Sequence, residues 1–284
     1  MIRQLNIRKL YQYSTIDVFL TGGVALFNEV TGFTQTAVNL TIAVDKYNHC
    51  IRSINPLTGE TAPYAGLCGK PGFADGRLVG EAQFSYPHTI VFHQGVLYVT
   101  DSKNHALRLL SAGRVSTIIR DSDAFPRPYG LIFSSDDLAY VTSQEKGLLQ
   151  LDLSSRLLTK LTNGRGIAGS LSAAQLLHPN GLTFLSPSVL LVTDPSTQRL
   201  LIVNINNGTI TKICDGKAAT RDGDIQSCQL LHPHSVLVVN QSVYVGQYKA
   251  IRRVPVAALN KFIPPVETTT AIPGRSSSPS PKPP

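Results

Sequence analysis

Short apolar runs, separated by polar residues or glycine, recur along this chain. Between residues 86 and 119 four of them follow one another, namely Thr89–Phe92, Val96–Thr100, Ala106–Leu110 and Val115–Ile119. Runs of four or five residues between turn residues predict β-strands, and four in succession predict one antiparallel sheet. A sheet of this size is not stable by itself, so its apolar face must pack against another element.

The same order of residues returns with a period near fifty. Residues 82–110 align with 25–54, 174–203 and 228–254, and a more divergent copy occupies 126–151. The second strands of these units end at Asp45, Asp101, Ser143, Asp194 and Gly246. Five such units predict an all-β fold, a β-propeller of four-stranded antiparallel blades in which each blade covers the next. A β-sandwich has similar strands but does not repeat one motif at this period.

The second unit carries a series of short motifs. They are Asp75-Gly76, Phe84-Ser-Tyr-Pro87, Leu97-Tyr-Val-Thr-Asp101, Asn104-His105 and Leu107-Arg108. This series resembles the NHL repeat, and the resemblance extends over residues 7–256, most clearly in units one, two, four and five. It implies a propeller, usually of six blades, that serves as a rigid platform for partners on its loop-rich faces.

The number of blades is open between five and six. Residues 7–19 look like the last two strands of a unit, because Ser14–Ile16 parallels Ser116–Ile118. This segment either closes the fifth blade or belongs to a sixth blade that begins upstream of a fragment. We expect six-bladed ancestry. The fifth unit offers only Val256–Ile263 as a weak fourth strand.

The chain changes character at its C-terminal end. Residues 264–284 contain seven prolines, four serines and three threonines. Such a segment buries too little apolar surface to offset its ordering entropy, which predicts a disordered linker or an O-glycosylated stalk. The expected organisation is therefore a propeller over residues 1–262 and a disordered tail over residues 263–284.

Four cysteines point to an oxidising compartment. Cys50 begins the third strand of the first unit and Cys68 lies just beyond the fourth, so the two can meet, and Cys214 has its nearest partner in Cys228. Of three possible connectivities, we expect Cys50–Cys68 and Cys214–Cys228; free buried thiols are the alternative. A zinc site is disfavoured because the sequence has no C-x-x-C. Disulfides predict an extracellular protein or ectodomain.

Two further features bear on location. Candidate glycosylation sites stand at Asn39, Asn207 and Asn240. No apolar run approaches the length of a membrane span, and Val18–Phe27 follows Asp17 and lacks a small-residue cleavage site, so we read it as a strand end and loop and find no clear signal peptide.

The net charge of +8 permits an acidic partner. The basic residues are scattered, however, and no aromatic-interleaved RNA-binding motif occurs, so binding of nucleic acid is not expected.

One position in each unit is a candidate for ligand binding. The residue that opens the innermost strand of a propeller blade points toward one mouth of the central channel. The aligned residues are Thr31, His88, Tyr129, Asn180 and His234. Polar groups that converge on such a channel form a natural site for a small ligand.

We expect no catalytic residues, no metal and no cofactor. The favoured function is a non-catalytic, extracellular binding platform for a protein, glycan or other ligand. A zinc-dependent lyase of the peptidylglycine-amidating type is one alternative, because Pro87-His88 and Pro233-His234 resemble its ligand motif, but the aligned Asn180 is a poor third ligand. An RNA-binding NHL domain is the other alternative; it requires a basic rim and free thiols.

Two histidines and two Asp-Gly pairs receive structural interpretations. His49 and His105 are expected to satisfy local backbone groups in their turns. Asp75-Gly76 and Asp222-Gly223 are interpreted as turn formers.

Overall fold

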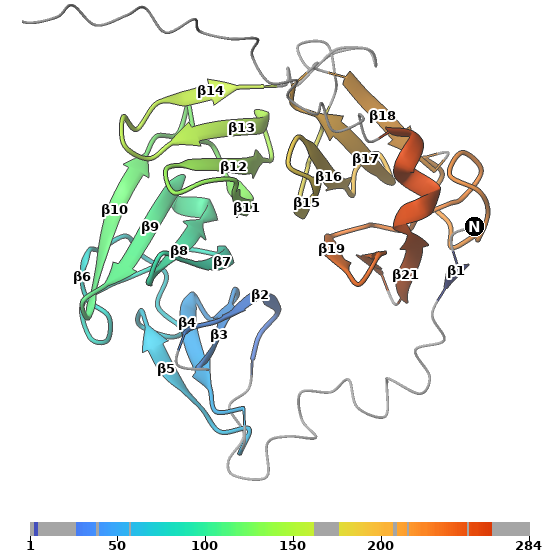
Figure 1. The fold of residues 1–284 in the computed structure, drawn as a ribbon. Coiled ribbons are helices and arrows are strands. Elements are labelled where there is room, and N and C mark those ends of the chain that lie inside the picture. The colour runs from blue at the N-terminus through green and yellow to red at the C-terminus, as the bar shows by residue number, and fades with distance from the viewer. Residues whose placement is uncertain are drawn as a thin grey trace, which may run out of the picture.

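The computed structural model describes residues 3–4, 27–37, 40–56, 58–161, 176–206, 209–214, 216–248 and 250–262. The predicted all-β propeller is confirmed: five antiparallel sheets are arranged around a common centre (Figure 1). The first blade consists of β2 (Val30–Gln35), β3 (Thr41–Asp45), β4 (Cys50–Ile54) and β5 (Thr61–Ala65). The second consists of β7 (Pro87–His93), β8 (Val96–Asp101), β9 (Ala106–Ser111) and β10 (Arg114–Arg120). The third consists of β11 (Pro128–Phe133), β12 (Leu138–Ser143), β13 (Gly147–Asp152) and β14 (Leu158–Lys160). The fourth blade consists of β15 (Leu182–Ser186), β16 (Val189–Asp194), β17 (Arg199–Asn204) and β18 (Thr209–Ile213). The fifth contains β19 (Ser235–Val239), β20 (Ser242–Gln247) and β21 (Ala250–Pro255).

The apolar core lies between blades. Ile42 and Val44 of β3 pack with Ile90 and Val99 of the second blade, and similar buried clusters join the second blade to the third, the third to the fourth and the fourth to the fifth. This is the packing that the period-two pattern of the strands predicts, because each sheet has an apolar face to cover. Among the described residues, no such cluster joins the fifth blade to the first, and Figure 1 shows these two blades standing apart.

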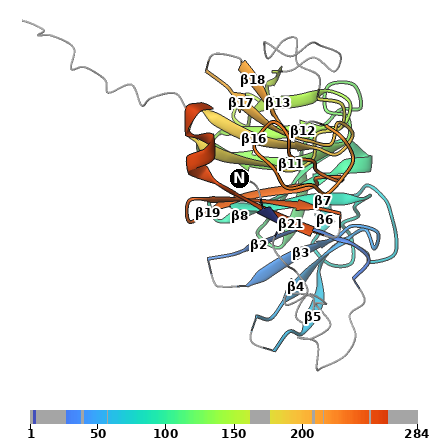
Figure 2. The same cartoon turned by 90° about the vertical axis from the view of Figure 1, so that its right-hand side faces the viewer.

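The fifth blade is completed by the N-terminal end of the chain. The backbone of β1 (Arg3–Gln4) pairs antiparallel with Arg252 and Arg253 of β21, and Figure 2 shows the two side by side. The segment 7–19, which we expected to supply strands, lies outside the described residues, as does the tail 263–284. The end of the chain thus seals the last blade, through residues upstream of the ones expected.

The prediction of a weak strand at Val256–Ile263 is wrong. Residues Val256–Phe262 form a 3-10 helix, η5, in which Leu259 is fully buried against the core of the fourth and fifth blades. The helical backbone is favoured by the residues Ala257, Ala258 and Leu259. Burial of the Leu259 side chain stabilises the helix further.

The interpretation of Asp75-Gly76 as a simple turn is also wrong. Gly76 begins a two-residue strand, β6 (Gly76–Arg77), which pairs with β10 as a fifth strand of the second blade. The Asp75 carboxylate accepts hydrogen bonds from the backbone N–H and the hydroxyl of Thr117, at 3.1 and 2.9 Å, and forms an ion pair with Arg108 at 2.7 Å. Asp222 forms the corresponding ion pair with Arg252 of the fifth blade. These aspartates therefore tie a loop to its blade.

Candidate functional site

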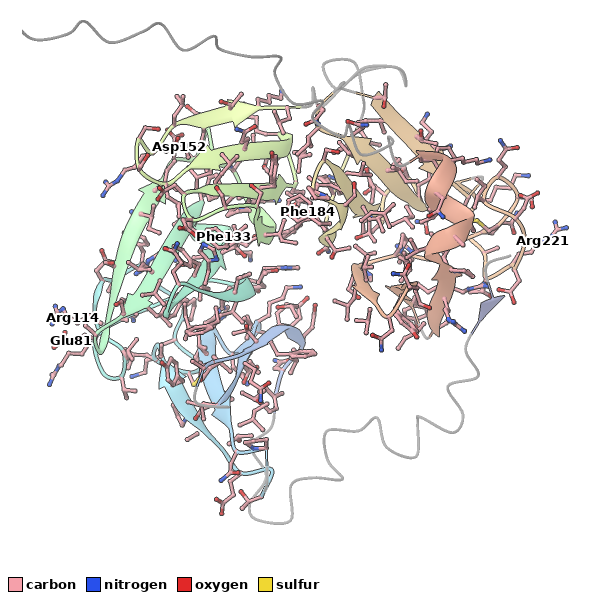
Figure 3. The ribbon with its side chains drawn as sticks, viewed as in Figure 1. Glu81, Arg114, Phe133, Asp152, Phe184 and Arg221 are labelled. Carbon is pink, nitrogen blue, oxygen red and sulfur yellow. A yellow bond between two sulfur atoms is a disulfide. The ribbon has the colours of Figure 1, made fainter. Side chains whose placement is uncertain are left out.

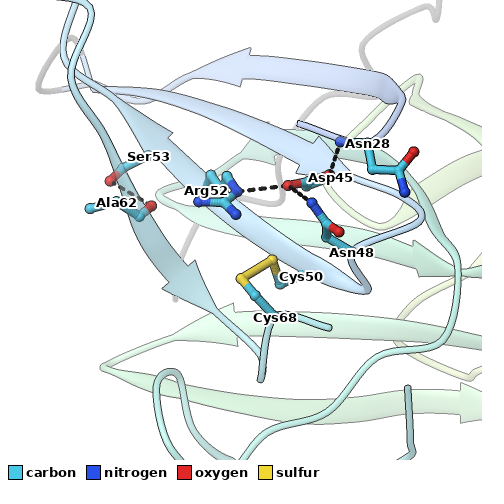
Figure 4. The surroundings of a disulfide bond; sticks show 8 residues. All are labelled: Asn28, Asp45, Asn48, Cys50, Arg52, Ser53, Ala62 and Cys68. Carbon is cyan, nitrogen blue, oxygen red and sulfur yellow. Dashed lines mark hydrogen bonds and ion pairs between the residues drawn. A yellow bond between two sulfur atoms is a disulfide. The ribbon is translucent and has the colours of Figure 1, made fainter. Parts of the chain in front are cut away.

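The aspartate that ends the second strand of a blade holds the loop that leads into the innermost strand. In the first blade Asp45 accepts hydrogen bonds from the Asn28 backbone N–H at 2.8 Å, from Asn48 Nδ2 at 2.9 Å and from Arg52 Nε at 2.6 Å (Figure 4). Equivalent backbone bonds run from Ser85 to Asp101 and from Leu177 to Asp194. The side chain of Asp45 thereby sets the point at which the chain turns toward the axis.

The fifth blade uses Gln247 in this position, whose Oε1 accepts the Leu231 N–H at 3.3 Å. The sequence alignment, which placed Gly246 here, is therefore wrong by one residue.

In the second blade, the aspartate at this position, Asp101, is fully buried together with its partner Arg108. Arg108 is fully buried and contacts Asp101 at 2.7 Å, and its guanidinium lies over the rings of Phe73 and Phe84. Loss of hydration raises the pKa of Asp101 to about 6, against the hydrogen bonds from Asn104, Ser85 and Arg108. This pair fixes the local geometry, because removal of Arg108 would leave the buried Asp101 carboxylate without a cation.

The turn histidines join neighbouring blades. His49 and His105 have left-handed backbone, with φ of 58° and 53°, and their Nδ1 atoms accept the backbone N–H groups of Tyr86 and Arg127 at 3.2 Å. In the fourth blade Gln198 Oε1 does the same for His232, at 2.6 Å. The backbone group that each side chain satisfies belongs to the following blade, so the interpretation of these bonds as local is wrong.

A second set of bonds fixes the channel positions themselves. Hydroxyl groups of one blade donate to the backbone carbonyl of the channel residue in the next: Thr31 to His88 at 2.6 Å, Thr100 to Tyr129 at 2.7 Å and Thr142 to Asn180 at 2.6 Å.

Glycine permits the close approach behind these bonds. A Cβ on Gly130 would lie 2.4 Å from the Asn180 carbonyl oxygen, and one on Gly181 would lie 2.7 Å from that of His234. These contacts fix the backbone at His88, Tyr129 and Asn180 relative to the preceding blade.

All five aligned channel residues line one cavity of about 500 Å³. Sequence reasoning missed most of its other walls, which are Glu29, Val30, Lys46, Gln144, His178, Pro195, Ser196 and Ser235. A signal for four of them was present: Lys46, Gln144, Pro195 and Ser196 follow the ends of second strands by one or two residues. The cavity therefore combines the starts of the innermost strands with the turns that follow the second strands.

His88 is the most constrained group in this cavity. Its side chain is 7% exposed, and its Nδ1 has no hydrogen-bond partner among the described residues. Loss of hydration, followed by the positive charge of Lys46 and by His234, lowers its pKa to about 3. The imidazole is therefore neutral at physiological pH and retains one donor and one acceptor nitrogen. Its ring centroid lies 4.4 Å from that of Tyr129.

The remaining walls are polar and nearly balanced in charge. Lys46 and Glu29 form an ion pair at 2.7 Å, and the Tyr129 hydroxyl donates to Gln144 Oε1 at 3.0 Å. Loss of hydration raises the pKa of Tyr129, and loss of hydration together with His232 lowers the pKa of His234. At neutral pH the cavity thus presents uncharged hydrogen-bonding groups beside one internally paired charge couple.

The opposite ends of the same innermost strands differ in character. Phe133 and Phe184, both labelled in Figure 3, line a hollow of about 390 Å³ between the third and fourth blades. The ring of His93 stacks on Phe133 at 4.0 Å. Polar, hydrogen-bonding walls therefore gather at the cavity end of the channel, and aromatic walls at the other.

Both predicted disulfides are present. The disulfide Cys50–Cys68 joins the first residue of β4 to the loop that follows β5 (Figure 4). The disulfide Cys214–Cys228 closes the loop that follows β18. No cysteine is free. This pairing is expected of an extracellular or otherwise oxidising environment.

Other sequence predictions concern the surface. Asn240 is exposed, with φ of 46°, in the turn between β19 and β20, whereas Asn39 and Asn207 lie outside the described residues.

In the part of the chain that the structure describes, no group of three His, Cys, Asp or Glu side chains is placed to hold a metal ion. Within the same residues, no helix has both the length and the apolar character to cross a membrane.

The fold and the axial cavity define a β-propeller whose channel mouth is lined from every described blade. Comparison with solved structures supports this class. The chain is similar to an auxiliary nutrient binding protein from Bacteroides ovatus, at 13% identity and a TM-score of 0.65, over 81% of this chain and 60% of the other. It is also similar to a chain of the nidogen/laminin complex, at 15% identity and a TM-score of 0.57, over 80% of this chain and 76% of the other. A third similar structure is virginiamycin B lyase from Staphylococcus aureus, at 14% identity and a TM-score of 0.53, over 80% of this chain and 66% of the other. At these identities the likeness is one of fold.

Sequence comparison assigns no family. No family model matches the chain. A curated relative, the chloroplastic protein SUPPRESSOR OF QUENCHING 1 of Arabidopsis thaliana, is 37% identical over 71 residues. That match covers 25% of this chain and only 6% of the plant protein.

Proposed function

We propose that this chain is an extracellular propeller of the NHL type that binds a ligand in its axial cavity and does not catalyse a reaction. The observation that carries the proposal is the buried His88, whose Nδ1 has no partner and whose ring lines the cavity. A buried polar atom without a partner costs about 1–3 kcal/mol, so the wall of the cavity holds a polar group that no described side chain satisfies.

The surrounding architecture supports a rigid receptor. Backbone hydrogen bonds and close contacts at Gly130 and Gly181 fix the channel residues of successive blades relative to one another. A preorganised site spends little binding energy on ordering its side chains. The NHL assignment is supported by the structural roles of Asp101, His105 and Arg108, since each motif residue holds an inter-blade loop.

A screen of small molecules tests the binding site. Ligand-observed NMR with a library of neutral, anionic and cationic fragments would be run on the full chain and on the double variant His88→Phe/Asn180→Leu. We expect hits whose signals are lost in the double variant, with its melting temperature recorded as a control for folding. A library that gives no hit, or only hits that the double variant retains, refutes the proposed site.

Compartment and chemistry have their own tests. Peptide mapping of the natural protein under non-reducing conditions should recover both disulfide-linked peptide pairs and a glycan on Asn240. Free thiols together with salt-sensitive RNA binding would support the RNA-binding alternative instead. Because His88 and His234 share the cavity, stoichiometric zinc in the purified protein would support the lyase alternative.

A further inference from the structure

We propose that the axial cavity accepts an uncharged, hydroxyl-rich ligand, namely a sugar. This inference rests on the proposed binding function and names the chemical class of the ligand. It follows from the charge balance of the walls, the kind of hydrogen-bonding groups they offer and the dimensions of the site.

The charge balance argues against an ionic ligand. Of the described residues that line the cavity, only Glu29 and Lys46 carry a full charge, and they neutralise each other at 2.7 Å. An ion that enters a partly buried site loses hydration, and it binds only where an opposite charge or several fixed dipoles replace that hydration. This cavity has no uncompensated charge among its described walls to offer.

The hydrogen-bonding groups are uncharged and include both donors and acceptors. The neutral imidazole of His88 and the carboxamide of Asn180 can each donate and accept, and the hydroxyl of Tyr129, which donates to Gln144, can still accept. The side chain of Asn180 makes no hydrogen bond to a described residue, which leaves its donor and acceptor for a ligand. A hydroxyl group also both donates and accepts, so neighbouring hydroxyls match such walls pairwise.

Other uncharged ligands fit these walls less well. A hydrocarbon group against Asn180 would cover its carboxamide without pairing it, at a cost of about 1–3 kcal/mol. The volume of about 500 Å³ lies within the range of small-ligand sites, and the cavity is open to solvent. A free monosaccharide and the terminal residue of a glycan chain share the required chemistry.

Titration calorimetry with the full chain tests the class. The probes are glucose, galactose, mannose and N-acetylglucosamine, their charged counterparts glucuronic acid and glucosamine, and a panel of neutral oligosaccharides. We expect at least one neutral sugar to bind, with a charged counterpart bound at least tenfold more weakly. Tighter binding of the oligosaccharide that ends in the same sugar would identify a glycan chain as the source, and equal binding would identify the free sugar.

Matched variants locate the binding. His88→Phe and Asn180→Leu should each weaken binding at least tenfold, whereas His93→Phe, the same replacement at the far end of β7, should leave it unchanged. Failure of every neutral sugar to bind, or equal binding of the charged counterparts, overturns the inference. If a ligand of another class binds and is lost in His88→Phe, the sugar class falls while the proposed binding site stands.

Discussion

In the variant His88→Phe, the buried imidazole is replaced by a ring of similar size that cannot take up a proton. The native side chain is 7% exposed, and its pKa is lowered from 6.5 to about 3. In the unfolded chain the same histidine is protonated below about pH 6.5. Between these two values the unfolded state binds a proton that the folded state does not.

The sign and size of the effect follow from proton linkage. The stability associated with neutral His88 is fully present above pH 6.5 and is lost as the pH falls from 6.5 toward 3. The loss is about 1.4 kcal/mol per pH unit, or about 2 kcal/mol between pH 7 and pH 5. The variant lacks this dependence, and at pH 7 it also gains about 1–3 kcal/mol because the unpaired Nδ1 is gone.

Urea denaturation of both proteins at several pH values measures the effect. The free energy of unfolding of the variant should exceed that of the native chain at pH 7, and the gap should widen by about 2 kcal/mol at pH 5. Between pH 7 and pH 8 the two curves should run parallel. If they run parallel down to pH 5 as well, His88 takes up protons in the folded protein as it does in water, and the buried imidazole at the centre of the proposed site is refuted.

Three further substitutions probe the scaffold that holds the cavity. Gly130→Ala places a methyl group 2.4 Å from the Asn180 carbonyl oxygen, so the midpoint of urea unfolding should fall by the equivalent of about 1–3 kcal/mol; an unchanged midpoint would show that the third and fourth blades are not in contact there. The double change Cys214→Ser/Cys228→Ser opens a 14-residue loop and should cost about 3 kcal/mol of unfolding free energy, an effect that vanishes if both proteins are compared after reduction. Asp101→Asn removes one of the two carboxylates that pair with the buried Arg108 and leaves Asp75 as the other, so it should cost about 1–3 kcal/mol of unfolding free energy; an unchanged value would show that the contact between Asp101 and Arg108 contributes nothing to stability.

Hydrophobic alternation and the repeat predicted most of the architecture. The four expected strands of the second unit appear as β7 to β10, and the divergent third unit forms a complete blade. Both disulfide pairs were also predicted, since Cys50 and Cys68 occupy the facing ends of a hairpin. These features are local or periodic, so they can be recognised along a single sequence.

The errors arose where a residue's partner is distant in sequence. Asp75 looked like a turn former, but it binds Thr117, 42 residues away; His49 looked local, but it binds Tyr86, 37 residues away. The segment at Val256 reads as a strand until the buried position of Leu259 is known.

The sequence by itself determined that one polar position per unit opens each innermost strand, because the repeat places that position in register. Only the tertiary structure decided what these positions do together. Packing of neighbouring blades buries His88 and leaves its Nδ1 without a partner, and the pairing of β2 with β3 in the first blade brings Lys46 against Glu29 so that their charges cancel. Loss of hydration and charge pairing depend on what surrounds a side chain in space, and that environment is built from blades whose residues are tens of positions apart.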